Sequence, residues 1–251
     1  MADRRRRVAV VVQSRMTSTR LPGKVLLPLD GRPLIWQVLE RAAAIDGVDV
    51  VVAAIPEGDG QGKLVELVSS HPTARVATGP EDDVLGRTIL AAEAVEADVV
   101  VRISSDCPMF DPRVSGAVLA AFLAVDAPYA RTDMEHGFPL GFDTEVVSVD
   151  ALRAAAAESR DRYEREHVTP FIWRRPDRFP AVHLGARPDR RWWRLTVDTP
   201  EDYDLASRVY DELGGDHPHF GYADLVALFT RRPELLEINR DIEQNAYRWG
   251  S

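Results

Sequence analysis

Positively charged side chains gather in one loop directly after the first apolar run of this 251-residue chain. Val8 to Val12 are consecutive apolar residues, typical of a buried strand. The loop that follows carries Arg15, Arg20 and Lys24 around the pair Pro22-Gly23. A strand would fix the position of this loop, the glycine would let the backbone come close to a ligand, and the cations would supply charge, so the segment favours phosphate binding. For any one cation alone, a solvated surface residue is the better interpretation.

Two aspartates follow later apolar segments in a similar way. Asp106 comes shortly after Asp98 to Ile103, Asp198 comes directly after Trp193 to Val197, and both segments are expected to be strands. Open α/β sheets bind ligands at the carboxyl ends of their strands, and Mg²⁺ is held by one or two carboxylates together with substrate phosphates. Both aspartates are therefore candidate metal ligands. The alternatives are an ordinary turn residue for Asp106 and a residue at the start of the next helix for Asp198.

Apolar periodicity predicts the elements that would position these residues. Leu34 to about Ile45 has helical spacing and Val48 to Ile55 forms a second strand, so the chain opens with a strand–helix–strand unit and a parallel sheet. Further strands are expected at Ala74 to Ala77, Gly141 to Val149, Val182 to Gly185 and Trp193 to Val197, the last two joined by a basic hairpin at Arg187 to Arg191. Further helices are expected from Leu64, from Pro112, over Arg153 to Ser159 and over Pro200 to Leu213, with an irregular stretch at Pro128 to Pro139. We expect one α/β domain over residues 1–251, a mostly parallel sheet with helices on both faces, and a helical C-terminal tail from about residue 218.

Composition narrows the classes of partner. A formal net charge of −9 disfavours nucleic acid and anionic membranes, and the run Arg4 to Arg7 is better explained as a solvated terminus. The sequence has no apolar run long enough to span a bilayer or to form a signal peptide. The lone Cys107 cannot form an intrachain disulfide, so a reducing cytoplasm is expected. The histidines are not spaced as zinc ligands.

Other polar segments have both a structural and a functional interpretation. In Thr78 to Arg87, Asp82 or Asp83 could cap a helix, or Asp83 and Arg87 could contact a ligand. Asp143 and Glu145 lie two residues apart and would share one strand face, exposed or functional. Glu166 and His167 could bind a second substrate or tie a helix to the sheet. The glycines of Gly58 to Lys63 match neither a dinucleotide loop nor a Walker motif, so a flexible connection is expected there.

Several of these segments resemble one family. Gln13 to Lys24, QSRMTSTRLPGK, is similar to the signature loop of the cytidylyltransferases that make CMP-activated sugars, in the branch named for spore coat polysaccharide biosynthesis protein F, where it usually reads Q-A-R-M-G-S-T-R-L-P-G-K. Similar segments follow at EDDVLGR, SSDCP, GFDTEV, REHVTP and VDTPED. The chain departs from the family pattern at Ser14, Thr17 and Ser105, which stand where the family has Ala, Gly and Gly. The resemblance covers about the first four-fifths of the chain.

The resemblance implies the three-layer nucleotide-diphospho-sugar transferase fold, which is Rossmann-like and GT-A-like. It implies transfer of CMP from CTP to a hydroxyl of an acidic or modified sugar, with Mg²⁺ on Asp106 and Asp198 and release of pyrophosphate. By this analogy Arg15, Lys24 and Asp106 are catalytic. The nucleotide would be bound by Gln13, Ser14, Arg15, Arg20, Gly23, Lys24, Asp83, Arg87 and Ser105, and the acceptor by Asp143, Glu145, Glu166 and His167. A homodimer is expected, with Trp192-Trp193 as a candidate face.

Two other functions stay open. A GT-A glycosyltransferase would use a nucleotide-sugar donor, but such enzymes typically hold metal with Asp-x-Asp, and Ser104-Ser105-Asp106 lacks the first carboxylate. A non-catalytic nucleotide- or sugar-binding protein is suggested by Thr17 and Ser105. The acceptor and the base preference are not fixed by the residues themselves.

Overall fold

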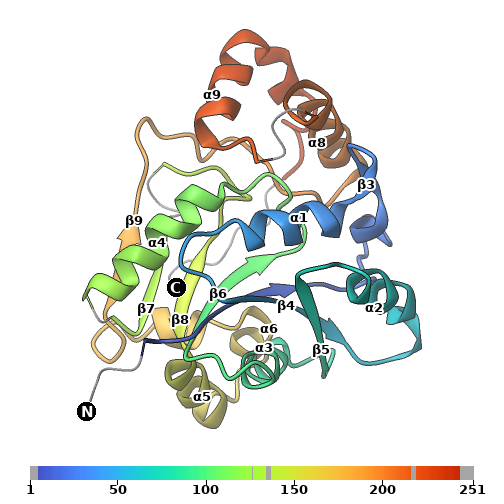
Figure 1. Cartoon of the computed structure of the whole chain (residues 1–251). Helices are drawn as coiled ribbons and strands as arrows, with labels where there is room; N and C mark the ends of the chain where they lie inside the picture. Colours follow the sequence, from blue (N-terminus) through green and yellow to red (C-terminus); the bar gives the residue numbers. More distant parts are fainter. Residues whose placement is uncertain (1–4, 126, 134–136, 216–218, 244–251) are drawn as a thin grey trace.

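A central sheet of seven strands in the order β5-β4-β1-β6-β8-β7-β9 organises the computed structural model, which describes residues 5–125, 127–133, 137–215 and 219–243 (Figure 1). The strands are β1 (Val8–Gln13), β4 (Val50–Pro56), β5 (Ala74–Gly79), β6 (Val99–Ser104), β7 (Tyr129–Thr132), β8 (Glu145–Ser148) and β9 (Ala181–Leu184), and β2 (Pro28–Leu29) and β3 (Arg32–Pro33) pair separately. The helices are α1 (Leu34–Ala43), α2 (Gly62–Ser69), α3 (Val84–Glu93), α4 (Pro112–Val125), α5 (Val149–Glu158), α6 (Arg162–His167), α7 (Pro170–Trp173), α8 (Pro200–Leu213) and α9 (Tyr222–Arg231). Short 3₁₀ helices lie at η1 (Lys24–Leu26), η2 (Asp59–Gln61) and η3 (Pro233–Glu237).

Helices cover both faces of the sheet because β1 is apolar at every position of its buried run. Val8, Val10 and Val12 join a core shared with α1, α4 and α8, whereas Ala9 and Val11 join a second core shared with α3 and α5. Successive side chains of a strand point to opposite faces, so a continuous apolar run requires cover on both sides. Figure 1 shows α1 and α4 on one side of the sheet and α3 and α5 on the other. The predicted three-layer α/β fold is confirmed.

The strand order creates a place for ligands. β5, β4, β1 and β6 are parallel, and the chain reaches β4 on one side of β1 but returns to β6 on the other. In open α/β sheets the crevice beyond the carboxyl ends of two such strands is the usual binding site. Here Gln13 at the end of β1 pairs with Ser104 at the end of β6, so the loops after both strands open into one space.

The second half of the sheet differs from the sequence prediction. β8 is antiparallel to β6 and starts only at Glu145, later than the predicted strand. The stretch Pro128 to Pro139, predicted to be irregular, contains β7, which pairs with β8. Residues 134–136 of that stretch lie outside the described residues. The predicted strand Trp193 to Val197 is wrong, and so is the basic hairpin before it, because β9 pairs in parallel with β7. Leu195 and Val197 are buried as extended chain, and their N–H groups bond the carbonyls of Leu140 and Asp106 instead of a strand.

The helix predicted over Pro200 to Leu213 is confirmed as α8. α8 starts with Thr199 as N-cap, Pro200 in its first turn and a capping box with Asp202, as this order of residues favours. The described part of the C-terminal segment then forms α9 and η3 and packs above the sheet (Figure 1). Arg4, His217, Pro218 and the end of the tail lie outside the described residues.

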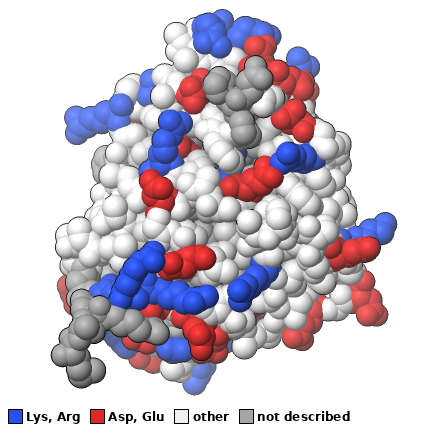
Figure 2. All heavy atoms as spheres, viewed as in Figure 1, with Lys and Arg blue, Asp and Glu red and all other residues white. Residues whose placement is uncertain are grey.

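Charge is mixed over the surface that faces the viewer. Figure 2 shows acidic and basic side chains interspersed, with broad uncharged areas between them. A search of the described helices finds none long and apolar enough to cross a membrane.

Candidate active site

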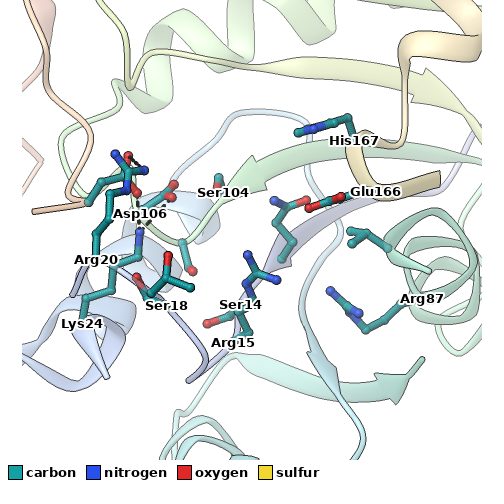
Figure 3. Close-up of a pocket in the computed structure, with 15 residues that line it drawn as sticks. Ser14, Arg15, Ser18, Arg20, Lys24, Arg87, Ser104, Asp106, Glu166 and His167 are labelled. Carbon is teal, nitrogen blue, oxygen red and sulfur yellow. Dashed lines mark hydrogen bonds and ion pairs between the residues drawn. The ribbon is translucent and has the colours of Figure 1, made fainter. Parts of the chain in front are cut away.

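An open cavity lies at the carboxyl ends of β1 and β6, with about 820 Å³ of empty space including its mouth (Figure 3). The residues that line it come from the end of β1 and the loop after it, α3, the end of β6 and the loop after it, the end of α6 and the chain before α8. They are Gln13, Ser14, Arg15, Ser18, Thr19, Arg20, Lys24, Val84, Arg87, Ser104, Ser105, Asp106, Glu166, His167 and Asp198. The geometry therefore brings together most of the residues proposed from sequence for the nucleotide, and both proposed metal ligands.

Lys24 sits between the two aspartates. Its Nζ donates to Asp106 Oδ2 at 3.0 Å, to Asp198 Oδ1 at 2.8 Å and to the carbonyl of Val197 at 2.8 Å. Burial alone would lower the pKa of Lys24, but the charges of Asp106 and Asp198 outweigh it and raise the pKa, so the ammonium stays protonated. Burial would conversely raise the pKa of Asp106, yet Lys24 holds it below its ordinary value. The three groups form an ion bridge that is largely withdrawn from water.

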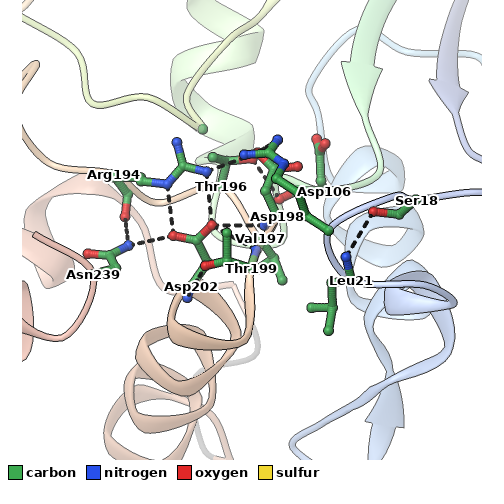
Figure 4. Close-up of polar contacts among 12 residues, drawn as sticks. Ser18, Leu21, Asp106, Arg194, Thr196, Val197, Asp198, Thr199, Asp202 and Asn239 are labelled. Carbon is green, nitrogen blue, oxygen red and sulfur yellow. Dashed lines mark hydrogen bonds and ion pairs between the residues drawn. The ribbon is translucent and has the colours of Figure 1, made fainter. Parts of the chain in front are cut away.

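A second hydrogen-bond network holds the other carboxylate oxygen of Asp198 (Figure 4). Arg194 donates to Asp198 Oδ2 at 3.0 Å and forms two bonds to Asp202, at 2.8 and 2.9 Å. Asp202 also accepts from the Asp198 backbone N–H and from Asn239 Nδ2, at 3.0 and 2.8 Å. Burial would raise the pKa of Asp202, but the bonds from Arg194 and Asn239 keep it lowered. The chain beyond η3 is thus linked through Asn239 to the Asp198 carboxylate.

The loop after β1 is shaped by a left-handed residue. Gly23 has φ 70° and ψ 13° and directly precedes η1, and its N–H bonds the carbonyl of Met16. Residues with a Cβ adopt this conformation at a cost, which explains a glycine here. Gly23 does not line the cavity; its position turns the chain so that Lys24 points inward. The buried Ser14 hydroxyl lines the cavity and has no hydrogen-bond partner among the described residues.

Arg15 and Arg87 extend the positive charge of the cavity away from Lys24. In Figure 3, Arg20, Lys24 and Asp106 lie on one side and Arg87, Glu166 and His167 on the other, with Arg15 between them. Burial and the nearby charge of Arg15 lower the pKa of Arg87, so positive charge is concentrated between these two residues. This stretch of the cavity would attract anionic groups.

Asp83 does not line this cavity. Its carboxylate caps α3 by accepting from the Gly86 N–H at 3.0 Å, and it pairs with Arg165 of α6. The structure thus gives it the capping position that the sequence left as an alternative. The Arg165 pair joins α6 to α3, and the end of α6 carries Glu166 and His167 to the cavity.

A second, smaller cavity of about 370 Å³ of empty space adjoins the first at His167. Asp143 lines it, and its carboxylate accepts from the Gly141 N–H at 3.1 Å. Burial, with the charges of Glu145 and Asp106, raises the pKa of Asp143 to about 6 against the bond from Gly141. Burial also lowers the pKa of His167, so its imidazole is neutral at neutral pH.

Glu145 also lines this cavity, but its carboxylate is engaged by the protein. It accepts from the Tyr129 hydroxyl, from Thr169 Oγ1 and from Arg102. Val168, between His167 and Thr169, has φ 74°, which is strained for a β-branched residue. The three bonds to Glu145 come from β6, β7 and the residue before α7, so Glu145 holds the wall of the second cavity in place.

Sequence reasoning missed several residues around the two cavities. Arg102 links the end of β1 to β8 through Gln13 and Glu145, and Arg131 lines the second cavity. Arg194 and Asn239 give no local signal, because a lone arginine in an apolar run and a lone asparagine in a tail are common. Arg194 could have been found only from its spacing to Asp198 and Asp202, which lie four and eight residues further along the chain.

Comparison with known proteins gives the class. A family model described as cytidylyltransferase matches residues 9–245, and the chain belongs to this family. The spore coat polysaccharide biosynthesis protein SpsF of Bacillus subtilis is 32% identical over 238 residues, which cover 90% of this chain and 95% of that protein. The 3-deoxy-manno-octulosonate cytidylyltransferase of Bradyrhizobium sp. is 38% identical over 250 residues, and the match covers 82% of this chain and 98% of that protein. The structure of a cytidylyltransferase from Leptospira borgpetersenii superposes with a TM-score of 0.88 at 27% identity and covers 95% of this chain and all of the other.

The network behind Asp198 predicts a large loss of stability in Asp202→Asn. The change removes the charge of the carboxylate that binds Arg194 through two bonds and leaves only Asp198 as its ionic partner, and breaking a buried pair on one side costs up to about 3–5 kcal/mol. Urea unfolding measures the change in free energy. Asp204→Asn on the same helix is the control, because its pair with Arg208 is half exposed and such pairs contribute less than about 1 kcal/mol. Equal effects of the two changes would contradict the network.

The raised pKa of Asp143 predicts a pH-dependent stability. The folded chain holds the Asp143 proton up to about pH 6 and the unfolded chain only to 3.8, so this group favours folding at low pH and that contribution is lost as the pH rises through 6. Between about pH 5 and about pH 8, the free energy of unfolding of Asp143→Asn should therefore rise by about 1 to 2 kcal/mol relative to that of the unchanged protein. Urea titrations without added metal measure the difference. The exposed Asp150→Asn should run parallel to the unchanged protein, and a parallel course for Asp143→Asn would refute the prediction.

Proposed function

We propose that this protein transfers CMP from CTP to a hydroxyl of an acidic or modified sugar, or of a sugar-like acceptor, and releases pyrophosphate. The observation that carries the proposal is the meeting of Lys24, Arg15 and Arg20 with Asp106 and Asp198 in one cavity at the switch point of the sheet. Membership of the cytidylyltransferase family supports cytidine as the nucleoside. The relative named 3-deoxy-manno-octulosonate cytidylyltransferase supports an acidic sugar as the class of acceptor.

The cations would hold the triphosphate. Arg15 and Lys24 would contact phosphate oxygens and steady the leaving pyrophosphate, with Arg20 and Arg87 at the two sides of the cavity. The free hydroxyl of Ser14 is available to the nucleotide, and Gln13 and Ser105 border the same space. Catalysis of this kind depends on positioning and on charge stabilisation, which this set of side chains can supply without a covalent nucleophile.

Asp106 and Asp198 fit a divalent cation by chemistry and by position. Both are oxygen donors that face the cavity, and an oxygen of each lies within 3.0 Å of the same Lys24 Nζ, so the two carboxylates converge. The described residues contain no cluster of three or more potential His, Cys, Asp or Glu ligands, which agrees with an ion such as Mg²⁺ held by one or two carboxylates plus phosphate. A bound divalent cation would neutralise charge that develops on the phosphate oxygens.

The acceptor would enter from the second cavity. Glu166 lines the first cavity, Asp143 lines the second and His167 lines both, and Asp143 is ionised above about pH 6. The oxygen of the acceptor hydroxyl attacks the α-phosphorus, a phosphorus–oxygen bond forms, and the bond to the bridging oxygen breaks with departure of pyrophosphate. We assign Asp143 to accept the hydrogen bond of that hydroxyl and to take its proton as the phosphorus–oxygen bond forms. Glu145 supports the wall.

We further propose that residues 1–251 act as one nucleotidyltransferase domain in the cytoplasm and as a homodimer. Of the candidate dimer face, Trp193 is buried, whereas Trp192 is 65% exposed and is the side chain that could meet a partner.

Thermal denaturation with nucleotides tests the proposal. CTP with Mg²⁺ at about a hundred times its dissociation constant should stabilise the fold by about 2.7 kcal/mol, which raises Tm by about 5–10 °C in a chain of this size. UTP, ATP and GTP should shift Tm less. Pyrophosphate release with a panel of acidic sugars then identifies the acceptor, and Asp106→Ala should abolish it.

Two results would contradict the proposal. Stabilisation by nucleotide-sugars alone would favour a glycosyltransferase, and CTP binding without pyrophosphate release over the whole panel would favour a non-catalytic binding protein. Asp204→Asn is the matched control for Asp106→Ala, because it removes a carboxylate that is half exposed and lies outside the cavity.

A further inference from the structure

We propose that Lys24 occupies, in the nucleotide-free protein, the position between Asp106 and Asp198 that a divalent cation needs. The cation would then bind well only together with the triphosphate, which draws the ammonium away from the carboxylates. This inference rests on the proposed function for its physiological ligand, but its central statement concerns the protein without nucleotide.

The geometry of the bridge carries the first step. One ammonium contacts Asp106 Oδ2 and Asp198 Oδ1 at 3.0 and 2.8 Å, and the side chain of Lys24 is only 9% exposed. Its third donor bonds the carbonyl of Val197 at 2.8 Å, so the ammonium has a complete set of acceptors. A metal ion bridging the same two oxygens would need the space that Nζ fills.

The charge balance carries the second step. Asp198 already receives Arg194 at 3.0 Å and Arg20 at 3.1 Å in addition to Lys24. Arg194 also pairs with Asp202, so with Lys24 in place three carboxylates are balanced by three cations, and a further divalent cation finds no uncompensated negative charge there. Removal of Lys24 from the bridge leaves Asp106 without an ion pair among those seen in the described residues, which makes a cation site there attractive.

The position of Lys24 in the chain carries the third step. It is the first residue of η1, next to the left-handed Gly23, and it lines the cavity where Arg15 and Ser14 would meet phosphate. Its four-carbon side chain can turn from carboxylate to phosphate without movement of the backbone. Phosphate oxygens in the cavity would replace the lost acceptors, so the ammonium would not be left buried without a partner.

Mn²⁺ binding to the nucleotide-free protein tests the inference, with free Mn²⁺ followed by electron paramagnetic resonance. The unchanged protein should bind Mn²⁺ weakly. Lys24→Met, which keeps the length of the side chain and removes its charge, should bind it at least about tenfold more tightly, and Mn²⁺ should raise the Tm of this variant more than that of the unchanged protein. Lys24→Gln replaces the methionine variant if that one does not fold.

Arg20→Gln is the matched control. It removes one positive charge from the same carboxylate, but Arg20 is 42% exposed and does not lie between the two aspartates. Its Mn²⁺ affinity should rise by less than about threefold, because solvent screens an exposed charge. Asp198→Asn added to Lys24→Met should remove the gain.

Equal Mn²⁺ affinity of the unchanged protein and both Lys24 variants, or an equal gain in Arg20→Gln, would overturn the inference. Failure of the proposed function gives a different pattern. In that case Lys24→Met still binds Mn²⁺ more tightly, while CTP neither binds nor enhances Mn²⁺ binding to the unchanged protein.

Discussion

The ion bridge from Lys24 to Asp106 and Asp198 joins three segments that are far apart in the sequence. Its members are largely withdrawn from water, and desolvation of buried charges is tolerable only when each charge keeps its partners. The bridge therefore holds the loop after β1, the loop after β6 and the chain before α8 in one arrangement. The Arg194–Asp202–Asn239 network extends this constraint to the C-terminal segment, because it fixes the other oxygen of Asp198.

This constraint explains how a largely conventional α/β sheet acquires a specific site. The switch in strand order between β1 and β6 creates an opening, but an opening has no chemistry of its own. The bridge places carboxylates and cations along one wall, and the Asp83–Arg165 pair brings α6 with Glu166 and His167 to the opposite wall. The second cavity meets the first at His167, so the two cavities adjoin.

Much of the fold could be predicted because it depends on local signals. The continuous apolar run of β1 demands cover on both faces, and Thr199, Pro200 and Asp202 mark the start of α8. Trp193 to Val197 was predicted wrongly as a strand, because its apolar residues are buried by tertiary packing and its N–H groups bond loop carbonyls. That Lys24 lies near both aspartates could be predicted in part, because ligand sites of open α/β sheets lie at the carboxyl ends of the strands. The direct bridge, the pair of Asp83 with Arg165, the engagement of Glu145 and the contact of Asn239 depend on long-range packing, which spacing does not encode.

A crystal structure with Mn²⁺ and a non-hydrolysable CTP analogue tests the central claim most directly, because anomalous scattering locates the metal independently of the protein. The account predicts the triphosphate in the cavity beside Arg15, manganese on Asp106 and Asp198, and the Lys24 ammonium moved from the carboxylates onto a phosphate oxygen. A nucleotide bound elsewhere, or bound in the cavity with Lys24 still bridging both aspartates and no metal between them, would contradict it.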